Sequence, residues 1–344
     1  MTFYYWAVTV FVMRKRARWI RVGCALTTGV GAYALVVGGV AVAAPPAGAA
    51  TPGIATASAL TGGTATIGKR ISASGITGLA TGTLQLGAGG VFDVVLPQKN
   101  VQLLPTTATM SLGFLKLDLP TTFSANSAIT GTATLGSGGI NATLTSSLST
   151  TAQVGPFSCT IGPIVASLTT GSSGSLTGTP FTGALTGEES GVLVANDFAV
   201  PAVQATSSCP GLVAGLVNIL AGLPLAPGAS SLTFHAALVN GLTGAPHQLV
   251  TVPTSGAAGT QVAVIGTGWS PTTAAQLAFT SGHPASTGTA AVDSSGALGG
   301  FLSVTSSDTA GSNPIVATQG TATASTPFTV VGTHNGGFFW PFGW

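Results

Sequence analysis

Residues 129–148 read Ile-Thr-Gly-Thr-Ala-Thr-Leu-Gly-Ser-Gly-Gly-Ile-Asn-Ala-Thr-Leu-Thr-Ser-Ser-Leu, and this stretch decides the fold class of the N-terminal part. Apolar and polar residues alternate in much of it, and the glycine-rich run Gly136–Gly139 separates its two halves. Alternation with a period of two is typical of a β-strand, in which successive side chains point to opposite faces. The sequence therefore predicts two strands, Ile129–Leu135 and Ile140–Leu148, joined by a turn.

Strand-like runs of the same kind recur from about Thr51 to Leu242. They are rich in Val, Ile, Thr and Leu, and turn-forming residues bound them. Many short strands at such spacing are typical of a sandwich or a barrel, and we expect an all-β chain in which residues 50–243 form a β-sandwich. Further examples of these runs are Thr83–Leu86, Val91–Leu96, Thr107–Leu112, Val192–Val200 and Leu232–Leu238.

One segment, residues 210–224, departs from the β pattern. It places Leu212, Leu216, Ile219 and Leu220 at helical spacing, with a proline at each end, so the sequence predicts one short apolar helix. Such a helix either plugs the open end of the sandwich or forms a lid over a cavity for an apolar ligand. We favour the plug, because most apolar helices belong to a core.

Cys159 and Cys209 are the only cysteines outside the N-terminal segment that contains Cys24. A cysteine pair in an exported protein most simply forms a disulfide, and closing a loop of about 50 residues contributes on the order of 4 kcal/mol. A metal pair or a catalytic thiol would call for a C-x-x-C spacing or nearby histidines, which the sequence lacks. We therefore predict a structural disulfide directly before the helix.

The N-terminal 49 residues have the three parts of a secretory signal peptide. Five basic residues lie between Arg14 and Arg21, the uncharged stretch Val22–Ala44 follows, and small residues end the segment. Both Ala41-Val42-Ala43 and Ala47-Gly48-Ala49 suit cleavage, and we favour the second. Residues 1–12 are apolar and precede the basic cluster, so we interpret them as a misassigned extension. An uncleaved anchor is the alternative, because Val22–Ala44 is long enough to span a bilayer.

The low content and the sign of charged residues argue against a nucleic-acid-binding protein. Nine Lys and Arg stand against seven Asp and Glu, and charged residues make up only 5% of the chain, far below the usual quarter or so. Without residues 1–49, four basic residues face all seven acidic ones, and the chain becomes net negative. Binding to nucleic acid needs a basic surface that neutralises phosphates, so we expect no nucleic-acid partner.

Residues 244–332 read as a second β domain. Seven short strands are predicted in it, which is the scale of an immunoglobulin-like sandwich. Trp269, in a loop, is expected to pack over the edge of the sheet. The predicted strands are Gln248–Val252, Thr260–Gly266, Ala275–Thr280, Thr287–Val292, Gly299–Val304, Pro314–Thr318 and Thr321–Val331.

This second domain carries the pattern V-x-V-P-x-S-G-x-x-G-T-x-V-x-V-x-G-x-G-W-x-P from Val250 to Pro271, then Asp293-x-x-Gly296 and Phe328-Thr329-Val330. These residues resemble bacterial immunoglobulin-like repeats of the IPT/TIG type. The resemblance implies a sandwich that serves as a spacer, an adhesion module or an appended domain of an exported protein. The chain departs from longer arrays in having a single copy.

The run from Phe198 to Ala229, with Cys209-Pro210-Gly211-Leu212 at its centre, resembles a pattern in exported actinobacterial proteins of unassigned function. The resemblance implies no activity. It implies an exported protein, as does the predicted signal peptide.

The last twelve residues, 333–344, form an aromatic tail. Five aromatic residues follow Gly336-Gly337, and they would form an adhesive patch if they were exposed. The tail either inserts at a lipid interface, docks into a partner, or folds back onto its own domain. The aromatic residues are Phe338, Phe339, Trp340, Phe342 and Trp344.

The sequence contains no recognisable catalytic or metal-binding motif. His235, His247, His283 and His334 are far apart, and no G-x-S-x-G motif occurs. The only adjacent acidic pair, Glu188-Glu189, lies among Gly, Ser and Thr, so we expect a solvated turn, with weak Ca²⁺ binding left open. We expect no catalytic residue, no cofactor and no enzyme.

Together these features predict a secreted or cell-envelope protein with a structural or adhesive role. Its partner would be a cell-envelope component or another surface protein, with lipid contact through the aromatic tail. One alternative is a membrane-active or pore-forming β protein of an outer lipid envelope, although the strands read nearer six residues than the roughly ten that a spanning strand needs. Another alternative is a carrier of an apolar ligand behind the helix.

Overall fold

The computed structural model describes residues 36–37, 40–41, 53–183, 189–242, 244–281 and 285–332. The chain divides into two compact units, Met1–Thr51 and Pro52–Trp344. In the first unit, β1 (Val36–Val37) pairs antiparallel with β2 (Val40–Ala41). The rest of the predicted signal peptide lies outside the described residues, and so do the aromatic tail and its five aromatic side chains.

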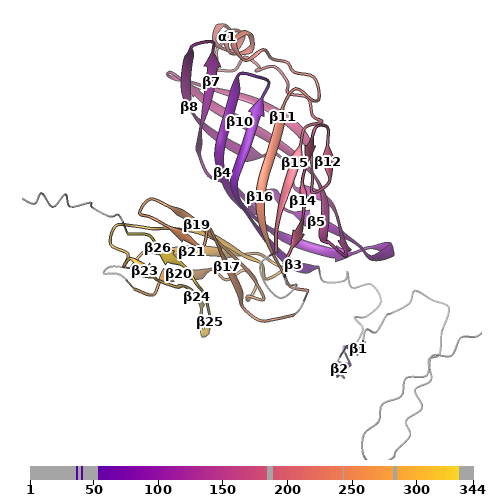
Figure 1. The fold of residues 1–344 in the computed structure, drawn as a ribbon, viewed down its shortest axis with the longest axis vertical. Helices are drawn as coiled ribbons and strands as arrows, with labels where there is room; N and C mark the ends of the chain where they lie inside the picture. Colours follow the sequence, from indigo (N-terminus) through magenta and orange to yellow (C-terminus); the bar gives the residue numbers. More distant parts are fainter. Residues whose placement is uncertain are drawn as a thin grey trace, which may run out of the picture. The chain divides into compact units, whose positions relative to one another are not determined.

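Twelve strands between Ile54 and Asn240 form one antiparallel sheet (Figure 1). Several of them are much longer than the runs expected from the sequence, because glycines that read as turn signals lie within paired strands. They are β3 (Ile54–Ile67), β4 (Ile71–Leu86), β5 (Val91–Leu96), β6 (Val101–Leu103), β7 (Thr106–Leu112), β8 (Leu115–Ala125), β9 (Ile129–Gly136), β10 (Gly139–Val154), β11 (Phe157–Thr169), β14 (Thr179–Thr182), β15 (Glu189–Ala195) and β16 (Ser231–Asn240).

The sheet returns to the strand from which it starts. Its order is β11-β15-β16-β3-β4-β5-β9-β10, and β10 pairs with β11 from Thr143↔Thr169 to Val154↔Phe157. The long strands β4 and β10 have different neighbours at their two ends. β4 pairs with β5 near one end and with β7 near the other, and β10 pairs with β9 near one end and with β8 near the other. β7 and β8 also pair with each other. We call this arrangement the closed sheet. It confirms the all-β prediction with one helix. A sandwich was expected for residues 50–243, whereas the strands form a single sheet that closes on itself.

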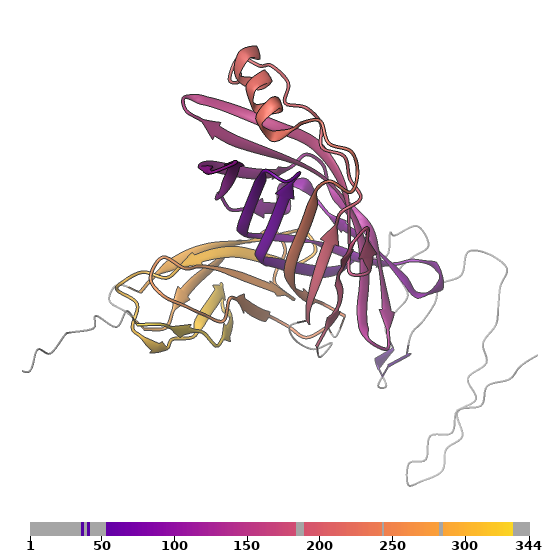
Figure 2. The same ribbon diagram turned by 45° about the horizontal axis from the view of Figure 1, so that its top comes forward.

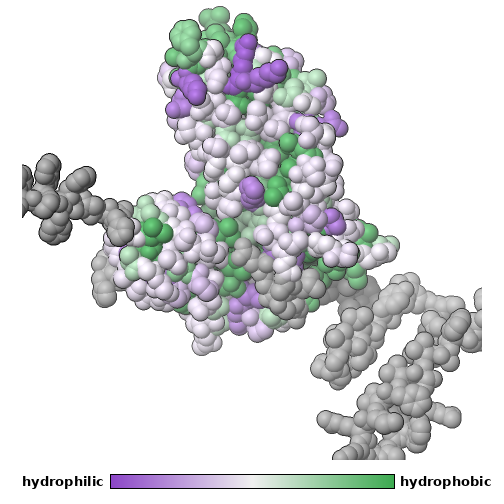
Figure 3. All heavy atoms as spheres, viewed as in Figure 1, coloured by the Kyte–Doolittle hydropathy of each residue, from purple (hydrophilic) through white to green (hydrophobic). Residues whose placement is uncertain are grey.

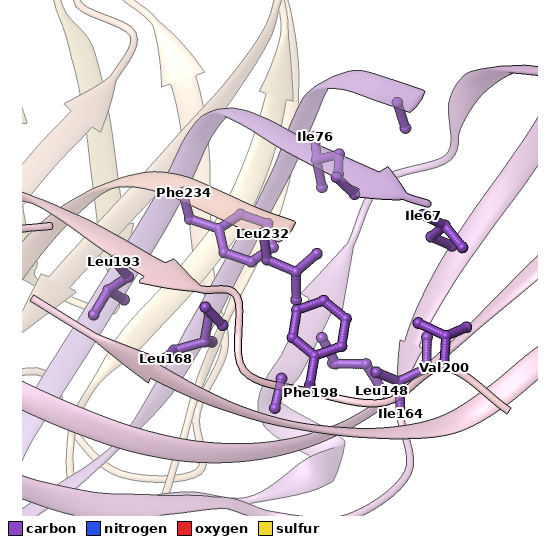
Figure 4. Close-up of a cluster of buried hydrophobic side chains, with 14 of the residues drawn as sticks. Ile67, Ile76, Leu148, Ile164, Leu168, Leu193, Phe198, Val200, Leu232 and Phe234 are labelled. Atoms are coloured by element: carbon purple, nitrogen blue, oxygen red, sulfur yellow. The ribbon is translucent and has the colours of Figure 1, made fainter. Parts of the chain in front are cut away.

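Alternation along the strands decides what lies inside the closed sheet. In β10, Ile140, Ala142 and Leu144 are buried whereas Asn141 and Thr143 are exposed. The same pattern in the other strands gives one large apolar core, and side chains such as Leu148, Phe198 and Phe234 converge in this interior from different elements (Figure 4). The face of the closed sheet seen in Figure 3 is mostly of intermediate hydropathy, because Thr and Ser occupy many outward positions.

The single α-helix of the described residues, α1 (Gly211–Ala221), lies at one end of the closed sheet (Figures 1 and 2). It follows Pro210 and ends at Gly222, whose φ of 74° is in the left-handed region that glycine adopts easily. The helix prediction for residues 210–224 is therefore confirmed. A two-stranded hairpin, β12 (Ser172–Ser173) with β13 (Leu176–Thr177), and the 3₁₀ turns η1 (Ala88–Gly90) and η2 (Gln98–Asn100) complete this part.

Residues 248–330 form two smaller sheets around a separate apolar core. The seven-stranded sheet has the order β17-β19-β22-β21-β20-β24-β25, and the three-stranded sheet has the order β18-β26-β23. Their bounds are β17 (Gln248–Val252), β18 (Ser255–Gly256), β19 (Gln261–Thr267), β20 (Ala275–Phe279), β21 (Thr287–Val292), β22 (Leu298–Ser303), β23 (Gly311–Ser312), β24 (Ile315–Gln319), β25 (Ala322–Thr326) and β26 (Thr329–Val330).

Trp269 is buried beside this core, and its Nε1 donates a hydrogen bond to the Gln248 carbonyl at 3.1 Å. The His247 ring stacks edge-on against it, with ring centroids 5.1 Å apart. Since an indole that is only 3% exposed has no free face for a sugar ring, Trp269 is a packing residue.

Candidate functional site

The interior of the closed sheet contains three cavities, which we call the interior cavities. The largest has a volume of about 90 Å³, and the two others have about 30 Å³ each. Neighbouring cavities share wall residues: Leu103, Leu148 and Phe234 border the largest and one smaller cavity. Ile67 and Phe123 border both smaller ones. The interior cavities therefore form a row along the inside of the sheet.

The walls of the largest cavity come from ten strands, β3 to β6, β9 to β11 and β14 to β16. Nearly all wall residues are apolar, among them Leu84, Ile129 and Leu193. Thr56 is a polar wall residue, but its hydroxyl already donates a hydrogen bond to the Val239 carbonyl at 3.4 Å. These walls offer dispersion contacts and little hydrogen bonding, so the space suits apolar groups better than water.

The wall of the outermost cavity includes α1. Val217 of the helix lines this cavity together with Met110, Cys159 and Ile161. Ala214, Val217 and Ala221 are the buried residues of α1 and face the core of the closed sheet. The helix is thus at once part of the core and the cover at this end of the row of cavities.

A disulfide joins α1 to the sheet. Cys159 of β11 is bonded to Cys209, two residues before α1 begins, with Cα atoms 5.0 Å apart. The predicted pairing is confirmed. Both cysteines are buried, and the Ser158 amide also donates to the Ser208 carbonyl at 2.9 Å, so a backbone hydrogen bond beside the disulfide joins the same two segments.

Two polar side chains fix the rest of the helix. The amide of Asn218 bonds the Val203 backbone twice: its Oδ1 accepts from the Val203 N–H at 2.7 Å and its Nδ2 donates to the Val203 carbonyl at 3.0 Å. Nη1 of Arg70 donates to the carbonyls of Leu220 at 2.8 Å and Ile219 at 3.3 Å. These last carbonyls of a helix lack partners within it, and a cation there also complements the helix dipole.

The face that α1 buries differs from the expected one. Of the four large residues at helical spacing, Leu212, Leu216 and Ile219 point outward and are 92%, 53% and 74% exposed, whereas Leu220 is partly buried against the core. Because α1 contains only one polar residue, Asn218, its apolar spacing cannot distinguish an inner face from an outer one. The small residues face the sheet, and this brings the helix backbone close to the strands.

Glu189 is a buried carboxylate that the sequence did not predict. We expected a solvated turn at residues 188–189, but Glu189 begins β15 and is 2% exposed. Asn240 Nδ2 donates to its Oε1 at 3.0 Å, whereas its buried Oε2 has no hydrogen-bond partner. Burial raises the pKa of Glu189, and the hydrogen bond from Asn240 opposes this only partly. Its cross-strand partner Leu238 lines the largest cavity.

Asp308 anchors a loop outside the closed sheet. Its carboxylate accepts hydrogen bonds from the backbone and hydroxyl of Ser286, at 3.0 and 2.6 Å, and of Thr305, at 2.7 and 3.1 Å. Burial alone would raise the pKa of Asp308, but these four bonds together lower it. The arrangement is that of a structural loop clamp.

Within the described ranges, no three His, Cys, Asp or Glu side chains come close enough to bind a metal ion together. The same ranges contain no helix that is long and apolar enough to cross a membrane. Of the predicted site residues, the structure brings together Cys159 and Cys209, while the five aromatic residues of the tail lie outside it. No family model matches the chain, and neither a curated protein nor a solved structure shows significant similarity to it.

Proposed function

We propose that the protein is a secreted or cell-envelope carrier, without catalytic activity, that holds a slender apolar molecule inside the closed sheet. The observation that carries the proposal is the row of interior cavities, which have apolar walls and are covered at one end by α1. A disulfide holds this cover, and disulfides of this kind belong to oxidising compartments outside the cytosol.

The size of the cavities limits the ligand. Ligand sites usually have a volume of about 300–1,000 Å³, whereas the largest interior cavity has about 90 Å³. A bulky ring system would therefore need extensive rearrangement. An aliphatic chain could pass from one cavity to the next with smaller movements of shared wall residues such as Leu103, Leu148 and Phe234.

The direction of the side chains disfavours the pore-forming alternative. A sheet that spans a bilayer carries apolar residues outward and leaves a polar interior. The closed sheet has the reverse pattern, as shown by buried Ile140 and Leu144 beside exposed Asn141 and Thr143. The structural or adhesive role, our first prediction from the sequence, rested on the immunoglobulin-like resemblance and on the aromatic tail, and the tail lies outside the described residues.

Binding of a fluorescent apolar probe, such as a fatty acid with a terminal fluorophore, tests the proposal in variants that fill the largest cavity. Ala133 and Ala142 line this cavity on β9 and β10. We expect Ala133→Leu to weaken probe binding at least tenfold, and Ala133→Val to weaken it less, because each added methyl group occupies ligand space. Ala88→Leu, the same change at an exposed position, is the matched control.

Thermal unfolding of each variant establishes that it is folded. Equal probe affinity in the wild type and both Ala133 variants would overturn the proposal, and so would a wild type that binds no apolar probe.

A further inference from the structure

Exposed apolar side chains gather at the end of the closed sheet that α1 covers. Among the described residues, ten large apolar side chains are exposed, and six of them belong to α1 or to the β7–β8 hairpin. Phe114, at the tip of this hairpin, is 101% exposed. We call these six residues the α1-end surface: Phe114, Leu115, Leu117, Leu212, Leu216 and Ile219.

Backbone contacts place the two parts of the α1-end surface next to each other. Arg70, in the turn between β3 and β4, donates to the carbonyls at the end of α1. The Arg70 carbonyl in turn accepts a hydrogen bond from the Ser111 amide at 2.7 Å. Ser111 of β7 is paired with Lys116 of β8, and Lys116 follows Phe114 by two residues. The end of α1 is therefore close to the tip of the β7–β8 hairpin. Figure 1 shows α1 at the same end as β7 and β8.

Basic side chains accompany this surface. Of the four described basic residues, Lys69, Arg70 and Lys116 lie at this end and are exposed, while Lys99 lies in η2. Two exposed acidic residues are near: Asp118, which accepts a hydrogen bond from Thr109 at 2.7 Å, and Asp197 after β15. The other described acids are Asp93, Glu189, Asp293 and Asp308, so this end is positive, whereas the rest of the described residues are net negative.

We propose that the α1-end surface docks on the surface of an anionic lipid bilayer. Protruding apolar residues bury themselves at the boundary between head groups and acyl chains, and lysines beside them attract anionic head groups. The helix α1 is apolar on nearly all sides. When its outer face lies at the bilayer interface, no apolar face of the helix remains in water. The α1-end surface consists of α1 and the tip of the β7–β8 hairpin, which both project from the sheet. Projecting side chains can enter the fluid head-group region of a bilayer.

This inference rests on the proposed carrier function. Docking would bring the cover of the interior cavities to the bilayer, and an apolar molecule could then pass between membrane and protein without crossing water. Val217 lines the outermost cavity, and its neighbour Leu216 lies on the outer face of α1. The same helix therefore contacts both the cavity and the proposed bilayer surface.

Co-sedimentation of the full chain with vesicles tests the docking surface. We expect binding to vesicles of equal parts phosphatidylcholine and phosphatidylglycerol, weaker binding to phosphatidylcholine alone, and a decrease at high salt. The double variant Leu212→Ser/Ile219→Ser and the single variant Phe114→Ser should each reduce partitioning about tenfold or more. Leu86→Ser and Val165→Ser, at exposed apolar positions of other strands, should leave it unchanged.

Charge reversal separates electrostatic attraction from insertion. Lys69→Glu/Lys116→Glu should abolish the preference for anionic vesicles, whereas Lys99→Glu should preserve it. Arg70 is left intact because it holds α1. Absence of vesicle binding, or equal losses in the control variants, would overturn the proposal. Self-association of the wild type that disappears in the Leu212→Ser/Ile219→Ser variant would also overturn it, by showing that a second copy covers the surface.

Probe binding distinguishes this failure from failure of the carrier function. The surface variants should bind the fluorescent apolar probe in solution as the wild type does, because none of these residues lines an interior cavity. A wild type that binds the probe but not vesicles contradicts the docking surface alone.

Discussion

Nη1 of Arg70 lies 2.8 Å from the carbonyl oxygen of Leu220 and joins the β3–β4 turn to the last turn of α1. The contact satisfies a carbonyl that the helix itself cannot satisfy. With the Cys159–Cys209 disulfide before the helix and Asn218 within it, Arg70 completes three attachments of the cover over the interior cavities.

We expect Arg70→Met to loosen α1 without unfolding the sheet. The variant loses two hydrogen bonds and a favourable charge at the helix end, which together contribute about 0.5–1.5 kcal/mol at an exposed site. Hydrogen exchange at the α1 amides should accelerate about threefold to tenfold, while exchange in β10 stays the same. Lys99→Met is the control, and equal acceleration in both variants would refute a specific role for Arg70.

Removal of the disulfide should destabilise the whole closed sheet. We expect Cys159→Ser/Cys209→Ser to lower the free energy of unfolding in urea by about 2–4 kcal/mol, because the bond restricts the unfolded chain. The wild type in reducing agent should behave like the variant, and the variant itself should not respond to reducing agent. A variant as stable as the oxidised wild type would contradict this prediction.

Because of Glu189, the free energy of unfolding should decrease as the pH rises, which is the reverse of the usual effect of a carboxylate. Since burial raises its pKa, the folded state retains a proton that the unfolded state has already released. Its favourable contribution is therefore complete below the ordinary pKa of a glutamate and is lost as the pH rises through the raised pKa. Glu189→Gln should remove this loss and be more stable than the wild type at neutral pH.

Urea unfolding across this range of pH checks the prediction. Asp93→Asn, which neutralises an exposed carboxylate, is the control and should keep the pH dependence of the wild type. Identical pH profiles for Glu189→Gln and the wild type would rule out the assigned role of Glu189.

Asp308 should have the opposite effect. Its four hydrogen bonds lower its pKa, so its contribution is present above the ordinary pKa of an aspartate and is lost as the pH falls through the lowered value. We expect Asp308→Asn to cost about 1–3 kcal/mol at neutral pH, because an amide cannot accept all four bonds. Chemical unfolding followed by tryptophan fluorescence, to which the buried Trp269 of this domain contributes, measures the loss, and the loss should shrink in acid.

The sequence predicted the elements whose local signals agree with the tertiary structure. The predicted strands Gln248–Val252 and Thr287–Val292 have the observed bounds. The predicted strand Thr321–Val331 is instead two strands, β25 and β26. Pro327 lies between them, and its missing N–H prevents continuous pairing.

Glycines concealed the length of the strands in the closed sheet. Gly82 lies within β4, and a Cβ there would collide with the Val95 carbonyl of the neighbouring strand. Gly131 in β9 has the same relation to the Thr143 carbonyl, although the predicted strand Ile129–Leu135 already included this glycine. Such glycines permit close approach of two backbones, which a sequence alone does not distinguish from a turn signal.

The candidate site was only partly predictable. The disulfide and the helix followed from cysteine count and from the two prolines, but the outward direction of Leu212 and Ile219 depended on packing against distant strands. Burial of Glu189 depends on Asn240, which is 51 residues away, while its own neighbours resemble those of a turn.

The carrier function is tested most directly by mass spectrometry of an organic extract of the protein, exported by its host and purified without detergent. We predict that the wild type carries an aliphatic molecule in near-equimolar amount and that Ala133→Leu carries much less of it. A wild-type extract that contains no apolar molecule above the level of the Ala133→Leu extract would contradict the account.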